Sequence, residues 1–189
     1  LLARYGKAVV ALPGGCAIGS RPIDLHIHGL EKLGARITLE HGYIKAEATK
    51  LCGAQVEFEK KTVGGTENLL MAASLAQGET ILKNCALEPE VSNLCELLIK
   101  MGAKIDGIGE EKIRIKGVGE LGEAVHEIIP DRVEAGTFLV AGALTQGDII
   151  LANVQPSHLD TVIEKLRYSG AKIERIRNHA LRVIGSPEI

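Results

Sequence analysis

Apolar positions along the chain recur in blocks that predict a repeated mixture of helices and strands. Residues 112–116 alternate Ile113 and Ile115 with charged residues, the two-residue period of a strand that buries one face. Residues 90–101 carry apolar side chains at helical spacing, and the glycine at 102 predicts where that helix ends. The other predicted elements of this block are a helix over 67–76 and strands over 80–83 and 104–108. The block therefore reads helix, strand, helix, strand, strand.

The same block occurs three times with a nearly constant period. A Gly-Ala pair follows a leucine-rich helical segment at residues 34, 102 and 170, so the pairs are 68 residues apart both times. The phrase at 75–82 returns in similar form at 144–151. Such self-similarity is typical of a fold built from one supersecondary unit. The third block covers about 133–184.

The first block is incomplete. It keeps only the last turn of its opening helix, at residues 1–5 before Gly6, followed by a strand over 8–11. Because the chain also lacks an initiator Met, we expect it to be an internal piece of a longer protein.

The opening helices of the second and third blocks are apolar on nearly every face, at 69–76 and 138–144. A helix of that kind has to be buried all round. We therefore expect helices clustered inside and sheets outside. A further strand over 55–58 precedes the second block, so the predicted fold class is α/β (α+β) with repeated β-α-β-α-β-β units.

Composition narrows the class of protein. Hydrophobic residues make up 46% of the 189 residues, and the formal net charge is −2, which argues against a general binder of nucleic acid or of an anionic membrane. No apolar run approaches a membrane span and no signal peptide is evident. The spacing of the four cysteines matches no zinc motif. We expect a cytoplasmic protein in which Cys52, Cys85 and Cys95 are small core residues.

The segment 12–26 is the densest in chemical groups. Glycines at 14, 15 and 19 surround Cys16, and Arg21 follows five residues later. Glycine permits close approach of a ligand, and a nearby guanidinium favours the thiolate form of an accessible cysteine. The sequence supports two readings here, a reactive thiol in a binding loop or a surface loop with an incidental cysteine.

A second glycine segment, at 59–66, lies between a strand and an apolar helix. Lys60 and Lys61 precede Thr62, Val63 and Gly64. The free amides of a helix start, together with two lysines, suit a phosphate group. The alternative is a helix start that is merely capped.

Two further segments have competing readings. If residues 24–28 formed a strand, Asp24, His26 and His28 would share one face and could bind a divalent metal, as in amidohydrolases. The other reading is a polar lead into the helix around residue 30.

At residues 129–137, Asp131 after proline predicts a turn and a helix N-cap, and Arg132 could add charge to an anionic site.

The string Leu-Pro-Gly-Gly-Cys-Ala-Ile-Gly-Ser-Arg-Pro-Ile-Asp-Leu-His at 12–26 resembles the active-site loop of the UDP-N-acetylglucosamine 1-carboxyvinyltransferase family. The resemblance continues through Pro-Asp-Arg-Val-Glu-Ala-Gly-Thr at 130–137. It implies two similar domains, each of three repeats, in an inside-out α/β barrel that is incomplete here. Residues 1–129 would belong to the domain with the catalytic loop, and 130–189 to the second domain. The sibling family that makes enolpyruvylshikimate phosphate lacks the cysteine loop.

The same resemblance implies an activity: transfer of the enolpyruvyl group of phosphoenolpyruvate to the 3′-hydroxyl of UDP-N-acetylglucosamine, with release of phosphate. Cys16 would be the proton donor and site of a covalent adduct, and Arg21 would bind the phosphate-bearing substrate. No cofactor, metal, nucleic acid or membrane partner is implied. Other site residues of the family fall outside residues 1–189, which implies that this piece alone is inactive. A sugar-nucleotide-binding member without activity is the remaining alternative. The implied sugar-nucleotide contacts are Arg21, Pro22, Ile23, Asp24, Leu25, Lys60, Thr62, Val63 and Gly64.

Overall fold

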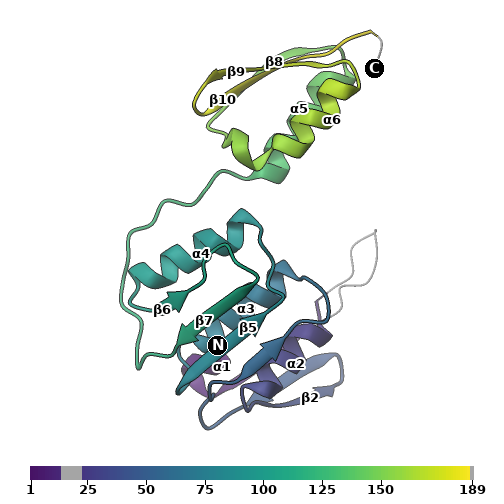
Figure 1. Ribbon diagram of the computed structural model, residues 1–189. Helices are drawn as coiled ribbons and strands as arrows, with labels where there is room; N and C mark the ends of the chain where they lie inside the picture. The colour runs from purple at the N-terminus through teal and green to yellow at the C-terminus, as the bar shows by residue number, and fades with distance from the viewer. Residues whose placement is uncertain (14–22, 188–189) are drawn as a thin grey trace. The chain divides into compact units, whose positions relative to one another are not determined.

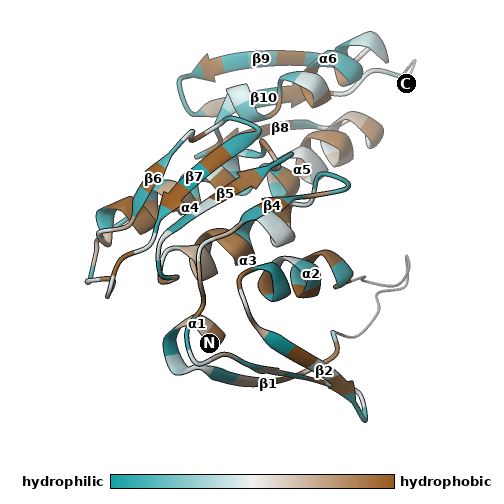
Figure 2. Ribbon diagram, turned by 60° about the horizontal axis from the view of Figure 1, so that its bottom comes forward, coloured by the Kyte–Doolittle hydropathy of each residue, from teal (hydrophilic) through white to brown (hydrophobic). Residues whose placement is uncertain are grey.

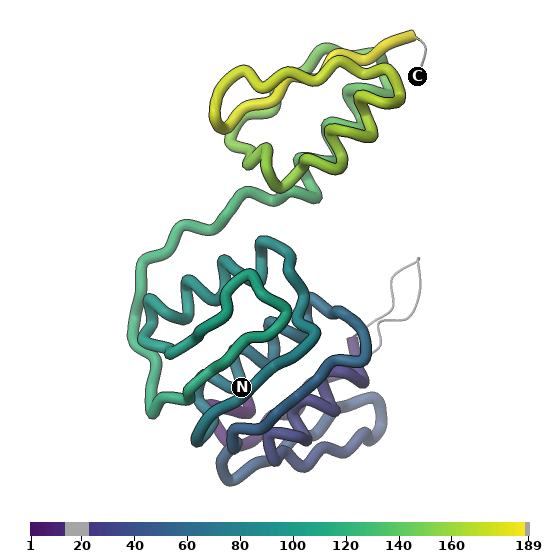
Figure 3. The backbone as a smooth tube through the Cα atoms, in the orientation of Figure 1, coloured from purple at the N-terminus to yellow at the C-terminus, as the bar shows by residue number. Residues whose placement is uncertain are grey.

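The computed structural model describes residues 1–13 and 23–187, which group into two compact units, Leu1–His126 and Glu127–Ile189. The extended segment between β7 and α5 connects the two units (Figures 1 and 3). Unit 1 contains α1 (Leu2–Tyr5), β1 (Lys7–Ala11), α2 (Asp24–Lys32), β2 (Arg36–Glu40), β3 (Tyr43–Glu47), β4 (Gln55–Glu57), α3 (Val63–Ala73), β5 (Glu79–Lys83), α4 (Pro89–Lys100), β6 (Lys104–Asp106) and β7 (Lys112–Lys116). Unit 2 contains α5 (Arg132–Leu144), β8 (Asp148–Ala152), a 3-10 turn (Pro156–His158), α6 (Asp160–Tyr168), β9 (Lys172–Arg177) and β10 (Ala180–Ile184).

The predicted repeat is confirmed by the order of these elements. Helix, strand, helix, strand, strand runs from α1 to β3, from α3 to β7 and from α5 to β10, and β4 completes the β-α-β-α-β-β order of the second block. Gly34, Gly102 and Gly170, at the ends of α2, α4 and α6, have φ of 93°, 103° and 101°. Glycine adopts this left-handed conformation without a Cβ penalty, so each helix stops at the same point of its block.

Three sheets cover the helices. The orders are β1-β3-β2, β4-β5-β7-β6 and β8-β10-β9; all pairs are antiparallel except β4 with β5. Strand β7 shows the predicted alternation of apolar and charged residues (Figure 2). Ile113 and Ile115 are buried, whereas Lys112, Arg114 and Lys116 are exposed.

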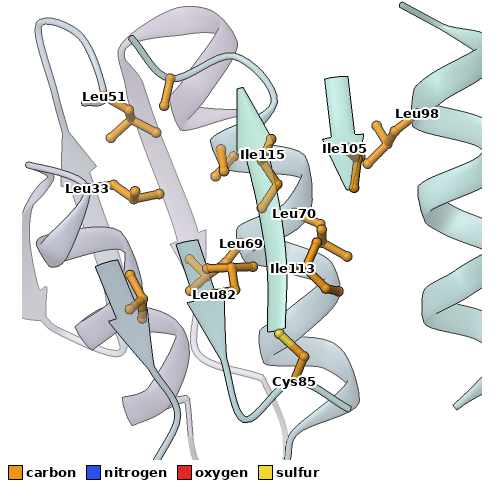
Figure 4. Packing of buried hydrophobic residues seen from close by; sticks show 14 of the residues in the cluster. Leu33, Leu51, Leu69, Leu70, Leu82, Cys85, Leu98, Ile105, Ile113 and Ile115 are labelled. Carbon is orange, nitrogen blue, oxygen red and sulfur yellow. The ribbon is translucent and has the colours of Figure 1, made fainter. Parts of the chain in front are cut away.

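Helix α3 is the centre of the core of unit 1. Leu69 and Leu70 of α3 lie with Leu82 of β5 and with Ile113 and Ile115 of β7 (Figure 4), and all five side chains are almost completely buried. Burying a side chain of this size contributes about 2 kcal/mol to stability. Helices α1, α2 and α4 also pack against α3. The predicted burial all round holds for most of α3 but not for Met71, which is 45% exposed.

Helix α5, the equivalent of α3 in unit 2, is different. Phe138 is 51% exposed and Leu144 71% exposed, so the prediction of burial on every face is wrong for this helix. Strands β8 and β10 and helix α6 pack against α5. Phe138 stands where Leu69 stands in α3, and Leu69 is covered by α2 of the preceding block. Among the described residues of unit 2, no helix covers Phe138 in that way.

Several helix and strand boundaries in the structure differ from the predicted ones by a few residues. Helix α3 begins at Val63, four residues before the prediction, because Thr62 caps it. It ends at Ala73, and a turn separates it from Gly78. Strand β6 ends at Asp106, where Gly107 adopts a φ of 85°. None of the described helices is both long enough and apolar enough to cross a lipid bilayer.

Two of the three cysteines assigned to the core are found there. Cys85 and Cys95 are fully buried, and burial raises the pKa of each thiol to about 11. They are therefore protonated and unreactive at neutral pH. The prediction is wrong for Cys52, which is exposed. Its neighbour Gly53 packs against the backbone of Glu79.

Helices α2 and α3 approach each other closely at Gly29. A Cβ on Gly29 would overlap the Cδ1 atom of Leu69, a side chain with no exposed surface. Glycine at this position lets the two helix backbones come together. The first turns of both helices lie beyond this crossing, so the crossing sets their spacing.

We expect Gly29→Ala to lower the free energy of unfolding by about 1–3 kcal/mol, the usual cost of overfilling a packed core. Alanine has the higher helix propensity by about 1 kcal/mol, so a loss of stability isolates the steric effect. Urea denaturation of the protein that contains these residues measures it. Unchanged stability would mean that Leu69 can move aside.

Candidate functional site

The first turn of α3 is held by side-chain hydrogen bonds on both sides. Thr62 is the N-cap: its Oγ1 accepts a hydrogen bond from the Gly65 amide at 3.1 Å. The hydroxyl of buried Thr66 donates to the Thr62 carbonyl at 2.7 Å and accepts from the Ala86 amide at 3.2 Å. Both readings of the segment agree on the cap, which is confirmed.

The cap leaves two backbone donors at this helix start. Within residues 1–13 and 23–187, the amides of Val63 and Gly64 have no hydrogen-bond partner. The first amides of a helix point outward and carry a partial positive charge. Gly64 is exposed, so the start of α3 offers two amides to an anion.

The turn that carries the lysines is anchored at both ends. The Phe58 amide donates to the Lys83 carbonyl at 3.1 Å, and the Phe58 carbonyl accepts from Asn84 Nδ2 at 2.8 Å. Between Phe58 and the Thr62 cap, both lysines are exposed. Lys61 forms an ion pair with Glu111 at 2.6 Å. Lys60 has no ion pair with any described residue, so its ammonium group is the one left for a ligand.

Asp24, His26 and His28 lie on a helix rather than a strand, because α2 begins at Asp24. Residues two apart on a helix are separated by about 200°, so the three side chains do not share a face. Among the residues that the structure describes, no three His, Cys, Asp or Glu side chains gather closely enough to bind a metal ion. The metal-dependent alternative is therefore wrong, and the reading of a polar lead into a helix is confirmed.

His26 instead faces α3. Its Nδ1 atom lies 3.2 Å from Asn68 Nδ2, and its ring edge would be in ordinary contact, 3.5 Å, with a Cβ placed on Gly64. Burial lowers the pKa of His26, and the charge of Asp24 partly offsets this shift. The neutral imidazole is thus the folded form at neutral pH. Sequence reasoning missed Asn68, because nothing in the local pattern distinguishes it from an ordinary polar position of α3.

Cys16, Arg21 and Pro22 lie outside the described residues. Of the other residues singled out from the sequence, Ile23, Asp24 and Leu25 begin α2, and Thr62, Val63 and Gly64 begin α3. The contact between His26 and Asn68 holds these two helix starts side by side. The structure therefore brings together the two described segments that were expected to bind one ligand.

Asp131 occupies in unit 2 the place that Thr62 has in unit 1. Its Oδ1 accepts from the amides of Val133, at 2.8 Å, and Glu134, at 3.1 Å, as the N-cap of α5. The predicted structural role is confirmed. The equivalent caps also show that the two opening helices start in the same way.

The fold is that of the enolpyruvyl transferases. The enolpyruvyl transferase NikO from Streptomyces tendae superposes with a TM-score of 0.83 at 19% identity, over 98% of this chain and 45% of that one. EPSP synthase from Acinetobacter baumannii gives a TM-score of 0.65 at 25% identity, over 95% and 42%. The model of the EPSP synthase (3-phosphoshikimate 1-carboxyvinyltransferase) family matches residues 1–188, and the chain belongs to this family.

Curated relatives resemble the chain much more closely in sequence. The UDP-N-acetylglucosamine 1-carboxyvinyltransferase of Koribacter versatilis is 62% identical over 184 residues, which are 97% of this chain and 42% of that protein. The protein of the same name from Geotalea uraniireducens is 54% identical over 189 residues, 100% and 45%. The chain thus spans less than half the length of these relatives.

Two adjacent glycines give a test of the α3 start. We expect Gly65→Ala to lower the free energy of unfolding by about 1 kcal/mol or more, because the new methyl group would displace the Thr62 side chain from its cap. Gly64→Ala is the matched control: its methyl group meets only the His26 ring at ordinary contact distance. Chemical denaturation should show an unchanged free energy of unfolding for Gly64→Ala. An equal decrease in both variants would contradict the stabilising role of the Thr62 cap.

Proposed function

We propose that this chain is part of a UDP-N-acetylglucosamine 1-carboxyvinyltransferase. The observation that carries the proposal is the 62% identity to a protein of that name over nearly the whole chain. The juxtaposed starts of α2 and α3 support it, since they hold the described positions matched to the sugar nucleotide. The enzyme would be cytoplasmic and would catalyse the first committed step of peptidoglycan synthesis.

The proposed reaction is an addition followed by an elimination. The 3′-hydroxyl of UDP-N-acetylglucosamine loses its proton to a general base and its oxygen bonds to C2 of phosphoenolpyruvate, while a proton is added to C3. Loss of a proton from C3 and of phosphate from C2 then restores the double bond, now in an enolpyruvyl ether. In its thiol form, Cys16 would supply the C3 proton as a general acid.

The other residues of the proposed site would bind the anionic groups of the two substrates. Arg21 would pair with the phosphate-bearing substrate through its planar guanidinium. The Val63 and Gly64 amides and the Lys60 ammonium group would receive oxygens of the sugar nucleotide. Thr62 would act through the cap and Ile23, Asp24 and Leu25 through the start of α2, with Pro22 before them. We further propose that residues 1–129 belong to the catalytic-loop domain and 130–189 to the second domain.

Replacing the thiol tests the reaction. In a full-length enzyme that contains these residues, we expect Cys16→Ala to lower phosphate release from the two substrates by at least about 100-fold, the usual contribution of a general acid. Cys16→Asp should retain part of the activity, because a carboxylic acid also donates a proton. Normal turnover by Cys16→Ala would refute the assignment.

The family resemblance also implies that fosfomycin alkylates Cys16, and a labelling experiment needs its own control. Cys52 is exposed and could be alkylated without any role in catalysis, whereas Cys85 and Cys95 are buried. The labelled residue must therefore be mapped by mass spectrometry. The proposal requires the label on Cys16, and Cys52→Ala should leave both labelling and turnover unchanged.

The two adjacent lysines give a second test. We expect Lys60→Ala to raise the KM for UDP-N-acetylglucosamine about tenfold, the loss expected for one hydrogen bond to a charged group. Lys61→Ala should leave this KM unchanged, because Lys61 is paired with Glu111 and exposed pairs contribute little. Equal effects of the two substitutions in steady-state kinetics would contradict the distinction.

A further inference from the structure

His26 and Asn68 form a side-chain hydrogen bond between two helices that are far apart in the sequence. His26 lies in the first turn of α2 and Asn68 in the second turn of α3, 42 residues later. Both side chains are half-buried. Their contact lies one turn from the Gly29–Leu69 crossing, on the side of the helix starts. The two contacts together define how the starts of α2 and α3 are placed.

The polarity of this hydrogen bond follows from the chemistry of its atoms. The amide nitrogen of Asn68 can only donate, so His26 Nδ1 accepts at 3.2 Å. A neutral imidazole with an acceptor at Nδ1 carries its hydrogen on Nε2. That nitrogen would lie 3.8 Å from a Cβ on Gly64, so the N–H group is beside the first turn of α3.

Burial of the ring, and not the surrounding charge, favours this neutral form. Asp24 is the charged group that acts on His26 from its own helix, and its effect is smaller than that of burial. On α3, the neighbours of the ring are Asn68 and the backbone of Gly64, neither of which titrates. The nearest carboxylate of α3 in sequence, Glu67, interacts with Glu90 of α4. Protonating His26 would place a hydrogen on Nδ1 and break the bond.

We propose that Asn68 is a positioning residue for the sugar-nucleotide site, because it holds His26 as the Nε2–H tautomer and keeps the starts of α2 and α3 in register. This inference depends on the function proposed above. Ile23–Leu25 at one start and Thr62–Gly64 at the other can face one ligand only while this register is kept. Asn68 is therefore required for tight binding of UDP-N-acetylglucosamine although it carries out no step of the reaction.

The experiment uses the full-length enzyme that contains these residues and a double-mutant cycle. Calorimetry measures the Kd for UDP-N-acetylglucosamine in wild type, Asn68→Leu, His26→Leu and the double variant. Each single substitution should raise Kd about fivefold, the equivalent of one neutral hydrogen bond. The double variant should bind as weakly as either single one, because both remove the same contact.

A second measurement follows the tautomer directly. Nitrogen-15 NMR of histidine-labelled enzyme, assigned with His26→Gln, should show the His26 hydrogen on Nε2 in the wild type and a mixture of tautomers in Asn68→Leu. The Kd of the wild type should also rise as the pH falls through the His26 pKa, which lies below the ordinary 6.5. That rise should be absent in Asn68→Leu.

Unit 1 offers a matched control, a second hydrogen bond between an asparagine and a histidine. Asn93 of α4 has its Nδ2 atom 2.8 Å from His126 Nε2, and Lys100 Nζ lies 3.1 Å from Nδ1 of the same ring. Asn93→Leu removes an asparagine–histidine contact from a more buried position. It should lower stability and leave the Kd for UDP-N-acetylglucosamine unchanged.

Several outcomes would overturn the proposal: a hydrogen on Nδ1 of wild-type His26, an unchanged Kd in Asn68→Leu, additive effects in the double variant, or an equal rise in Asn93→Leu. An enzyme that binds UDP-N-acetylglucosamine but releases no phosphate would instead refute the reaction proposed above. In that case the Kd values still decide the role of Asn68. If wild type binds no UDP-N-acetylglucosamine, both proposals fall.

Discussion

The packing of α3 at the centre of unit 1 is the constraint on which the rest of the structure depends. Leu69 and Leu70 contact sheet residues on one side, while α1, α2 and α4 surround the helix on the others. A helix enclosed in this way cannot shift without displacing its neighbours, because protein interiors are packed at the density of organic crystals. The first turn of α3 is therefore held in place. Its position determines where the Thr62 cap, the exposed amides and the lysine turn lie.

The proposed sugar-nucleotide site lies where two helices begin. The starts of α2 and α3 come from different repeats, and each contributes the turn that precedes or begins its helix. Backbone groups that the helix itself cannot satisfy become available to an anionic ligand at such ends. The same repeat that builds the core thus brings two helix starts together, which a single repeat could not do.

Helices α3 and α5 differ in how far a neighbouring block covers their apolar surface. The two helices have equivalent caps and similar apolar sequences, yet α5 exposes Phe138 and Leu144. The difference is that α3 follows a block whose α2 covers it, whereas the described part of unit 2 holds one block. Each unit of a repeat fold leaves an apolar surface that the next unit buries. Exposure of α5 is therefore a property of the isolated block, and its sequence is suited to burial.

Local features of the chain could be read from its amino-acid order. The repeat, the strand alternation at Ile113 and Ile115, the glycine stops at Gly34, Gly102 and Gly170, and the cap at Asp131 depend on periodicity and backbone conformation, which act over a few residues. The features that could not be read depend on distant partners. His26 meets Asn68 across 42 positions, Lys61 rather than Lys60 meets Glu111 across 50, and Cys52 is exposed whereas Cys85 and Cys95 are buried. Such contacts form only when the chain is folded, because no local pattern specifies which remote side chain will be opposite.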